Sequence, residues 1–159
     1  MKRGPILFLR VVIVLVGVGV LAGMLVEPQF EGVNANADFA GAYLDDPFLV
    51  YAYVGSIPFF FGLYQAFKLL GYLGGGQAFS ADARQAARTI KYCALAVIAF
   101  IAGAEAYIML IVVSDDRAGA VMLGILATFV GLVAVAGAAV LERVLQNGGD
   151  LQLDHDLTV

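Results

Sequence analysis

The sequence predicts an all-α membrane protein with four transmembrane helices in an up-and-down bundle, and two observations support this. The chain has 159 residues, of which 62% are hydrophobic and only 14% are charged, whereas globular domains are about half apolar and a quarter charged. It also contains four apolar runs, each of about the 20 residues that a helix needs to cross a hydrocarbon core of about 30 Å. We place these spans at about residues 5–26, 48–70, 91–113 and 119–141.

The hydrophilic segments are too short for a separate soluble domain, so residues 1–159 form one transmembrane domain. The stretch GGGQAFSADA reads as a flexible turn, in which the Ser80 hydroxyl caps a helix that continues into the third span. The stretch LERVLQNGG continues the fourth helix until Asn147, Gly148 and Gly149 stop it. We therefore expect the third and fourth helices to extend beyond the membrane, and residues 142–159 to form a helix extension with a short acidic tail.

Small residues predict where the helices pack, because close approach of backbones drives helix association in lipid. In the fourth span they recur every three or four residues, at Gly124, Ala127, Gly131, Ala134 and Ala138. We expect this face to contact a neighbouring helix.

The distribution of basic residues predicts the orientation, because Lys and Arg gather on cytoplasmic flanks. Of the nine basic residues, Arg117 alone lies on the opposite side from Lys2, Arg3, Arg10, Lys68, Arg84, Arg88, Lys91 and Arg143. The loop at residues 27–47 has five acidic residues and no basic one. We expect both termini in the cytoplasm and this loop outside. A secretory signal cleaved near ANA at residues 35–37 is the alternative, but about ten residues, some acidic, separate that site from the apolar run.

The residue types argue against catalysis and against a bound cofactor. The single cysteine, Cys93, cannot form the pair that thiol exchange requires, and the single histidine, His155, lies in the tail rather than among the spans. The sequence has no phosphate-binding loop and no His or Cys cluster with metal-ligand spacing. We expect a protein that is not an enzyme, with no cofactor, no metal and no direct binding of nucleic acid.

Glu105 is the main polar residue inside a predicted span, about 13 Å from the outer surface. A central carboxylate costs about 2.5–3.5 kcal/mol, and the other spans carry no cation at that depth. Neutral groups at the same depth are Ser56, Thr128 and the backbone carbonyl of Val54. That carbonyl is free because Pro58, four residues later, has no amide hydrogen to donate; Pro58 should also kink the helix. Two interpretations remain open: a neutral structural carboxylic acid in this polar layer, or an oxygen-lined proton or cation site.

The extended third helix carries a basic stripe, because Arg84, Arg88 and Lys91 lie at positions i, i+4 and i+7. Contact with anionic lipid headgroups is one interpretation, at about 1 kcal/mol per charge. The other is a docking face for an acidic cytoplasmic partner.

Four stretches carry a resemblance to a known family: KRGPILFLRVVI, IPFFFGLYQAFKLLGYL, AFS followed ten residues on by IKYCA, and LQNGGDLQLDHDLTV. Together they resemble the YoaS-like family of small bacterial membrane proteins, a domain of unknown function. The resemblance implies an inner-membrane protein with four spans and no established activity, whose gene often lies beside one for a small helix-turn-helix regulator. It supplies no functional residues, and Glu105 lies outside the stretches that carry it.

Two functions are compatible with these observations. The first is a non-catalytic interaction or sensing module for a cytoplasmic partner such as that regulator, based on the basic stripe, the helix extension and the acidic tail. The second is a small proton- or cation-coupled carrier or channel component that uses Glu105 and would need homo-oligomers, because four helices enclose little room. A partner that stays bound in Glu105→Gln would support the first. Flux lost in the same variant would support the second. We favour the first, because it does not depend on one residue.

Overall fold

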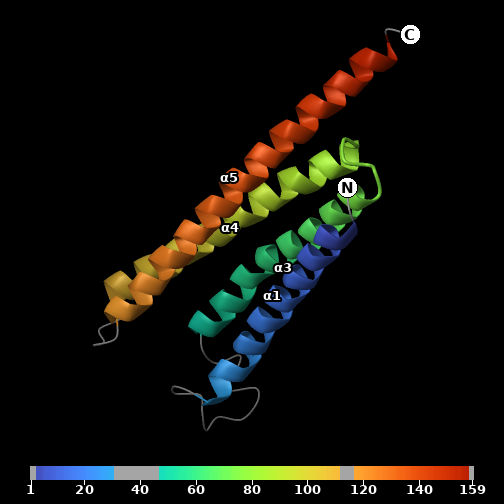
Figure 1. Ribbon diagram of the computed structural model, residues 1–159. Coiled ribbons are helices and arrows are strands. Elements are labelled where there is room, and N and C mark those ends of the chain that lie inside the picture. Colours follow the sequence, from blue (N-terminus) through green and yellow to red (C-terminus); the bar gives the residue numbers. More distant parts are fainter. Residues whose placement is uncertain (1–2, 31–46, 112–116, 158–159) are drawn as a thin grey trace.

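The computed structural model describes residues 3–30, 47–111 and 117–157, which form four helices. These are α1 (Arg3–Phe30), α3 (Pro47–Gly74), α4 (Ala81–Ile111) and α5 (Arg117–Asp156). They run alternately up and down, and α5 projects beyond the others at its C-terminal end (Figure 1). All four are long and apolar enough to cross a membrane. Most of the acidic loop and the end of the predicted third span, residues 31–46 and 112–116, lie outside the described residues.

A tight turn joins α3 to α4 and makes them antiparallel. After α3, Gly76 adopts a φ of +76°, a left-handed conformation that glycine accepts without steric cost. The amide of Gln77 donates to the Tyr72 carbonyl at 2.9 Å and so closes the end of α3. The Ala83 amide donates to the Ser80 hydroxyl oxygen at 3.2 Å, which confirms the predicted cap of α4.

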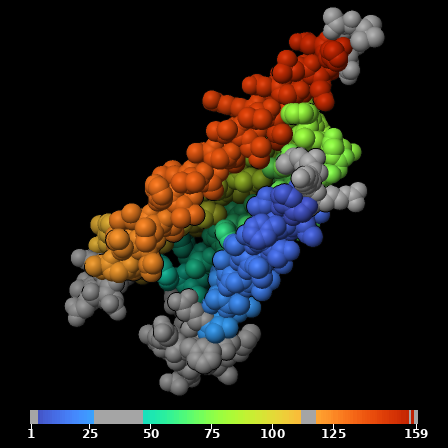
Figure 2. Space-filling view, in the orientation of Figure 1, coloured from blue at the N-terminus to red at the C-terminus, as the bar shows by residue number. Residues whose placement is uncertain are grey.

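Each helix packs only against its neighbours in the chain. Contacts join α1 to α3, α3 to α4, and α4 to α5, and no other pair of helices makes contact within the described parts of the chain. The helices therefore form an open row, and Figure 2 shows α1 and α5 as separate ridges with α3 visible between them. The all-α class and the four apolar helices are as predicted.

The seam of α5 against α4 has a coiled-coil spacing. From Val121 to Gly149, the residues of α5 that are buried or half-buried at steps of three and four are Val121, Gly124, Thr128, Gly131, Val135, Ala138, Glu142, Leu145 and Gly149. This confirms the predicted packing role of Gly124, Gly131 and Ala138. The prediction for Ala127 and Ala134 was wrong, because both are exposed.

The buried apolar core lies at one end of the row, where α3 ends, α4 begins and α5 passes both. We call this cluster the helix junction; it comprises Leu69, Ala83, Ala86, Ala87 and Leu145. Within the spans, by contrast, large side chains such as Leu110 and Leu123 are 84% and 69% exposed. In lipid, apolar side chains gain little from being buried in protein. The hydrophobic effect therefore favours their burial mainly where the helices leave the hydrocarbon and meet water.

The prediction that α5 stops at Asn147, Gly148 and Gly149 was wrong, because the helix continues to Asp156. Gly148 faces the Phe79 ring so closely that a Cβ atom would overlap it. Gly149 is buried, and a Cβ atom there would lie 3.4 Å from the Phe79 carbonyl oxygen. These glycines therefore allow α5 to pack against the α3–α4 turn and do not end the helix.

Candidate functional site

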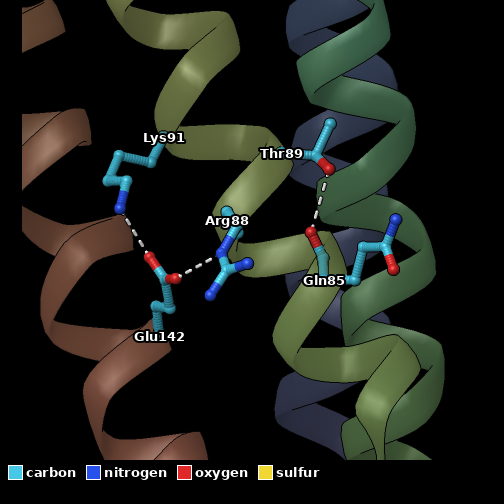
Figure 3. A network of polar contacts seen from close by, with 5 residues as sticks. All are labelled: Gln85, Arg88, Thr89, Lys91 and Glu142. Carbon is cyan, nitrogen blue, oxygen red and sulfur yellow. Dashed lines mark hydrogen bonds and ion pairs between the residues drawn. The ribbon is translucent and has the colours of Figure 1, made fainter.

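The basic stripe on α4 faces an acidic residue of α5 at the helix junction. Glu142 follows directly after the fourth predicted span, and Lys91 begins the third, so antiparallel packing brings them to the same level. Arg88 Nε donates to one carboxylate oxygen of Glu142 at 2.7 Å, and Lys91 Nζ donates to the other at 2.7 Å (Figure 3). One carboxylate therefore joins two cations of α4 to α5.

Burial differs among the three members of this bridge. The side chain of Glu142 is 12% exposed, that of Lys91 23% and that of Arg88 61%. Hydrogen bonds from Lys91 and then Arg88 lower the pKa of Glu142, which lies outside the predicted spans, below its ordinary value. The hydrogen bond to Glu142 also raises the pKa of the Arg88 guanidinium. The bridge is therefore charged at neutral pH.

Arg84, the third residue of the basic stripe, does not take part in the bridge to Glu142. Its guanidinium lies near Gly149 of α5, where a Cβ atom would be 3.7 Å from Cζ. Among the described residues, no carboxylate forms an ion pair with it. A groove of about 370 Å³ runs beside it between α4 and α5, lined also by Gln85, Glu142 and Gln146. Thr89 also lines this groove, and its hydroxyl donates to the backbone carbonyl of Gln85, one turn earlier in α4, at 2.9 Å (Figure 3).

Sequence reasoning missed Glu142, and its position in the sequence could have revealed it. Glu142 comes just after the fourth span, and the basic residues come just before the third. Because these two helices are antiparallel, the end of one lies beside the start of the other, so the acidic and basic residues lie at the same level. Among the residues that the structure describes, the predicted docking face therefore keeps one cation without an ion pair, Arg84, rather than three.

Inside the membrane, the structure brings Glu105 and Thr128 into the same interface. The Glu105 side chain lies against Gly124 of α5, where a Cβ atom would be 2.8 Å from its Cγ. Thr128 is one turn further along the same seam. Glu105 Oε1 and Thr128 Oγ1 are both buried, and neither has a hydrogen-bond partner among the residues described.

The other members of the predicted polar layer lie elsewhere. Ser56 donates to the Tyr53 carbonyl of its own helix at 2.7 Å, and it lines an apolar groove between α3 and α4 with Phe100 and Ala104. Val54 is 48% exposed, and α3 continues as a helix through Pro58. The structure therefore does not bring Ser56, Val54 or Pro58 together with Glu105, because α3 and α5 lie on different sides of α4.

Two tyrosines of α3 connect it to the helices on either side. The Tyr51 hydroxyl donates to the Phe100 carbonyl of α4 at 2.8 Å, and the Tyr53 hydroxyl donates to the Met24 carbonyl of α1 at 2.9 Å. A phenol in an apolar setting needs such a partner. These bonds hold α3 in register between its neighbours.

Comparisons with known proteins place this chain in a recognised family. A family model described as "Protein of unknown function (DUF2975)" matches residues 32–159. The chain is also 36% identical to an uncharacterized membrane protein, YoaS, of Bacillus subtilis strain 168, over the full length of both chains. No solved structure matches.

Proposed function

Because the chain belongs to the DUF2975 family of membrane proteins, we propose that it is a non-catalytic integral membrane protein whose helix junction binds a cytoplasmic protein. The observation that carries this proposal is the burial of apolar side chains at the helix junction. Ala83 and Ala87 are fully buried there and Leu145 is 3% exposed, as in a water-soluble fold. A purely lipid-embedded protein would not need to bury apolar side chains beyond its spans.

The proposal places the protein in the bacterial inner membrane with both termini in the cytoplasm. The start of α1, the turn between α3 and α4, and the far end of α5 lie at one end of the molecule (Figure 1). The basic residues of the described helices, apart from Arg117, belong to this end. The excess of Lys and Arg on cytoplasmic flanks supports this orientation.

The surface chemistry suggests what kind of partner the junction accepts. Arg84 offers a guanidinium without an ion-pair partner among the described residues, beside a groove with the amide side chains of Gln85 and Gln146. Such a groove suits a carboxylate with neighbouring polar groups. The family resemblance suggests a small helix-turn-helix regulator as the source of that acidic surface.

Binding of a purified small helix-turn-helix regulator of the kind that the family resemblance implies, measured by biolayer interferometry with the full-length protein in lipid nanodiscs, tests this proposal. Arg84→Glu should weaken binding by about tenfold or more, because charge reversal puts two negative groups together. Arg143→Glu, the same reversal at an exposed arginine of α5, and Glu105→Gln should leave it unchanged. No binding by the wild-type protein, or equal losses in Arg84→Glu and Arg143→Glu, would contradict it.

The buried oxygens of Glu105 and Thr128 favour a second candidate function, a proton- or cation-coupled carrier or channel component. Neither atom has a hydrogen-bond partner in the described part of the chain, and intramembrane carboxyl groups often belong to ion pathways. Proton uptake into liposomes containing the purified protein tests this candidate. A carrier or channel function requires a pH-dependent proton flux in the wild-type protein that is lost in Glu105→Gln. Equal flux in the wild type and in Glu105→Gln would exclude this function.

A further inference from the structure

A second polar feature, separate from the helix junction, lies between α1 and α3 at the same end of the molecule. A groove of about 530 Å³ opens there, and we call it the Arg10 groove. Its walls include Gly4, Ile6 and Arg10 of α1 and Leu70, Gly71 and Gly74 of α3. Its volume is in the range of small-molecule sites, and its surface combines apolar side chains with one cation.

The guanidinium of Arg10 is held in place inside this groove. It lies over the Phe67 ring, with Cζ 4.8 Å from the ring centroid. It also depends on Gly71, because a Cβ atom at that position would be 2.7 Å from Arg10 Nη2. A residue with any side chain at position 71 would force this guanidinium to move.

Among the described residues, Arg10 has an aromatic neighbour but no anionic partner. Its Nε atom is buried and has no hydrogen-bond acceptor among the described residues, and no described carboxylate forms an ion pair with it. A buried charged donor is ordinarily satisfied by an anion or by several acceptors. Nε itself is enclosed, but the terminal amino groups of the guanidinium are not among the buried atoms, so an external acceptor can reach Arg10 there.

The position of the groove indicates the kind of anion. Arg10 is seven residues beyond the start of α1, or about 10 Å along the helix, and a long arginine side chain reaches back toward the headgroup level. The neighbouring side chains Leu7 and Phe8 are 65% and 67% exposed. They offer acyl chains an apolar surface beside the cation.

We propose that the Arg10 groove binds the phosphate group of an anionic phospholipid. The planar guanidinium presents parallel N–H donors that match two phosphate oxygens. Free phosphate and a lipid headgroup both carry such oxygens. The exposed apolar surface beside the groove favours the lipid. Lys68, one turn before Gly71 on α3, is exposed, but its ammonium lies 5.8 Å from the centroid of the Tyr64 ring and outside the lining of the groove. This inference does not depend on the partner proposed for the helix junction.

Native mass spectrometry of the full-length protein, delipidated in a neutral detergent, tests the proposal. When either lipid is added back, the wild-type protein should bind one phosphatidylglycerol in preference to phosphatidylcholine. Arg10→Gln should bind it about tenfold more weakly or worse, because the charge-assisted bonds are lost. The matched control, Arg143→Gln, removes an exposed arginine at the same end of the molecule and should bind like the wild type.

Gly4→Leu is a second variant that keeps the charge and fills the groove. No atom lies within 4 Å of a Cβ atom at Gly4, so the leucine side chain has room there, and it should also weaken lipid binding while the thermal stability stays unchanged. Equal losses in Arg10→Gln and Arg143→Gln, or undiminished binding in Gly4→Leu, would overturn the proposal. So would displacement of the lipid by millimolar inorganic phosphate, because the site would then recognise the free anion.

Discussion

Two glutamates on neighbouring helices show how position decides the role of a carboxyl group. Glu142 lies just beyond the fourth span and accepts hydrogen bonds from two cations at 2.7 Å. Glu105 lies within a span, and its Oε1 atom has no partner among the described residues. Lys and Arg are available where the helices leave the lipid but are costly inside it. Glu142 is therefore a structural connection between α4 and α5, whereas Glu105 is the group whose protonation a transport function would need.

The bridge at Glu142 predicts a pH dependence of stability. The pKa of Glu142 is lower in the folded protein than in the unfolded chain. The bridge therefore stabilises the fold fully above the carboxyl pKa of the unfolded chain, about 4.3. This stabilisation is lost as the pH falls through the lower pKa of the folded protein. We expect the apparent melting temperature to fall over this acidic range, and to fall less in Glu142→Gln. Light-scattering melts in detergent from pH 7 to pH 3 measure it. Parallel curves for the two proteins would contradict the prediction.

At the scale of the element, α5 changes its packing along its length. Within the span its seam against α4 uses small residues, Gly124 and Gly131, which leave room for the side chains of Glu105 and Ile98 of α4. Beyond the span the seam uses Leu145, which is 3% exposed, and Gly148, against which the Phe79 ring lies. The same heptad-like spacing therefore continues from lipid into water: α4 side chains pack against glycines within the span, and apolar side chains are buried beyond it.

Two glycines of α5 give a matched test of this seam. A Cβ atom at Gly131 would lie 2.7 Å from Ile98 Cγ1, whereas at Gly137 no atom lies within 4 Å. Gly131→Leu should reduce the free energy of unfolding by about 1–3 kcal/mol through overpacking. Gly137→Leu should leave it nearly unchanged. Unfolding by sodium dodecyl sulfate in mixed micelles measures both. Equal effects in the two variants would mean that α5 does not pack on α4 through this face.

At the scale of the whole molecule, the described helices form an open row rather than a closed bundle. The absence of contact between α1 and α5 in the described regions leaves long apolar faces for lipid. The burial is concentrated at the helix junction, where Leu69 of α3 and Leu145 of α5 belong to one apolar cluster with Ala87 of the intervening α4. The molecule thus combines a lipid-solvated row of spans with one compact end.

The proposed orientation can be tested with single cysteines in a Cys93→Ala background. Asp154→Cys, near the end of α5, should react with a membrane-impermeant maleimide only after the cells are permeabilised, because we place this end in the cytoplasm. Ala118→Cys, at the start of α5, should react in intact cells. Both positions are exposed in the structure. Labelling of Asp154→Cys in intact spheroplasts would reverse the orientation.

The sequence alone determined the membrane class, the four spans and the Ser80 cap of α4, because length, hydropathy and capping are local properties of the chain. Only the tertiary structure decided that Glu142 pairs with Arg88 and Lys91, that Glu105 faces Gly124 rather than Ser56, and that α5 continues through Gly148. These features depend on which faces of two helices meet. A glycine that would end an isolated helix instead admits the Phe79 ring, because packing against a neighbour outweighs a weak local preference.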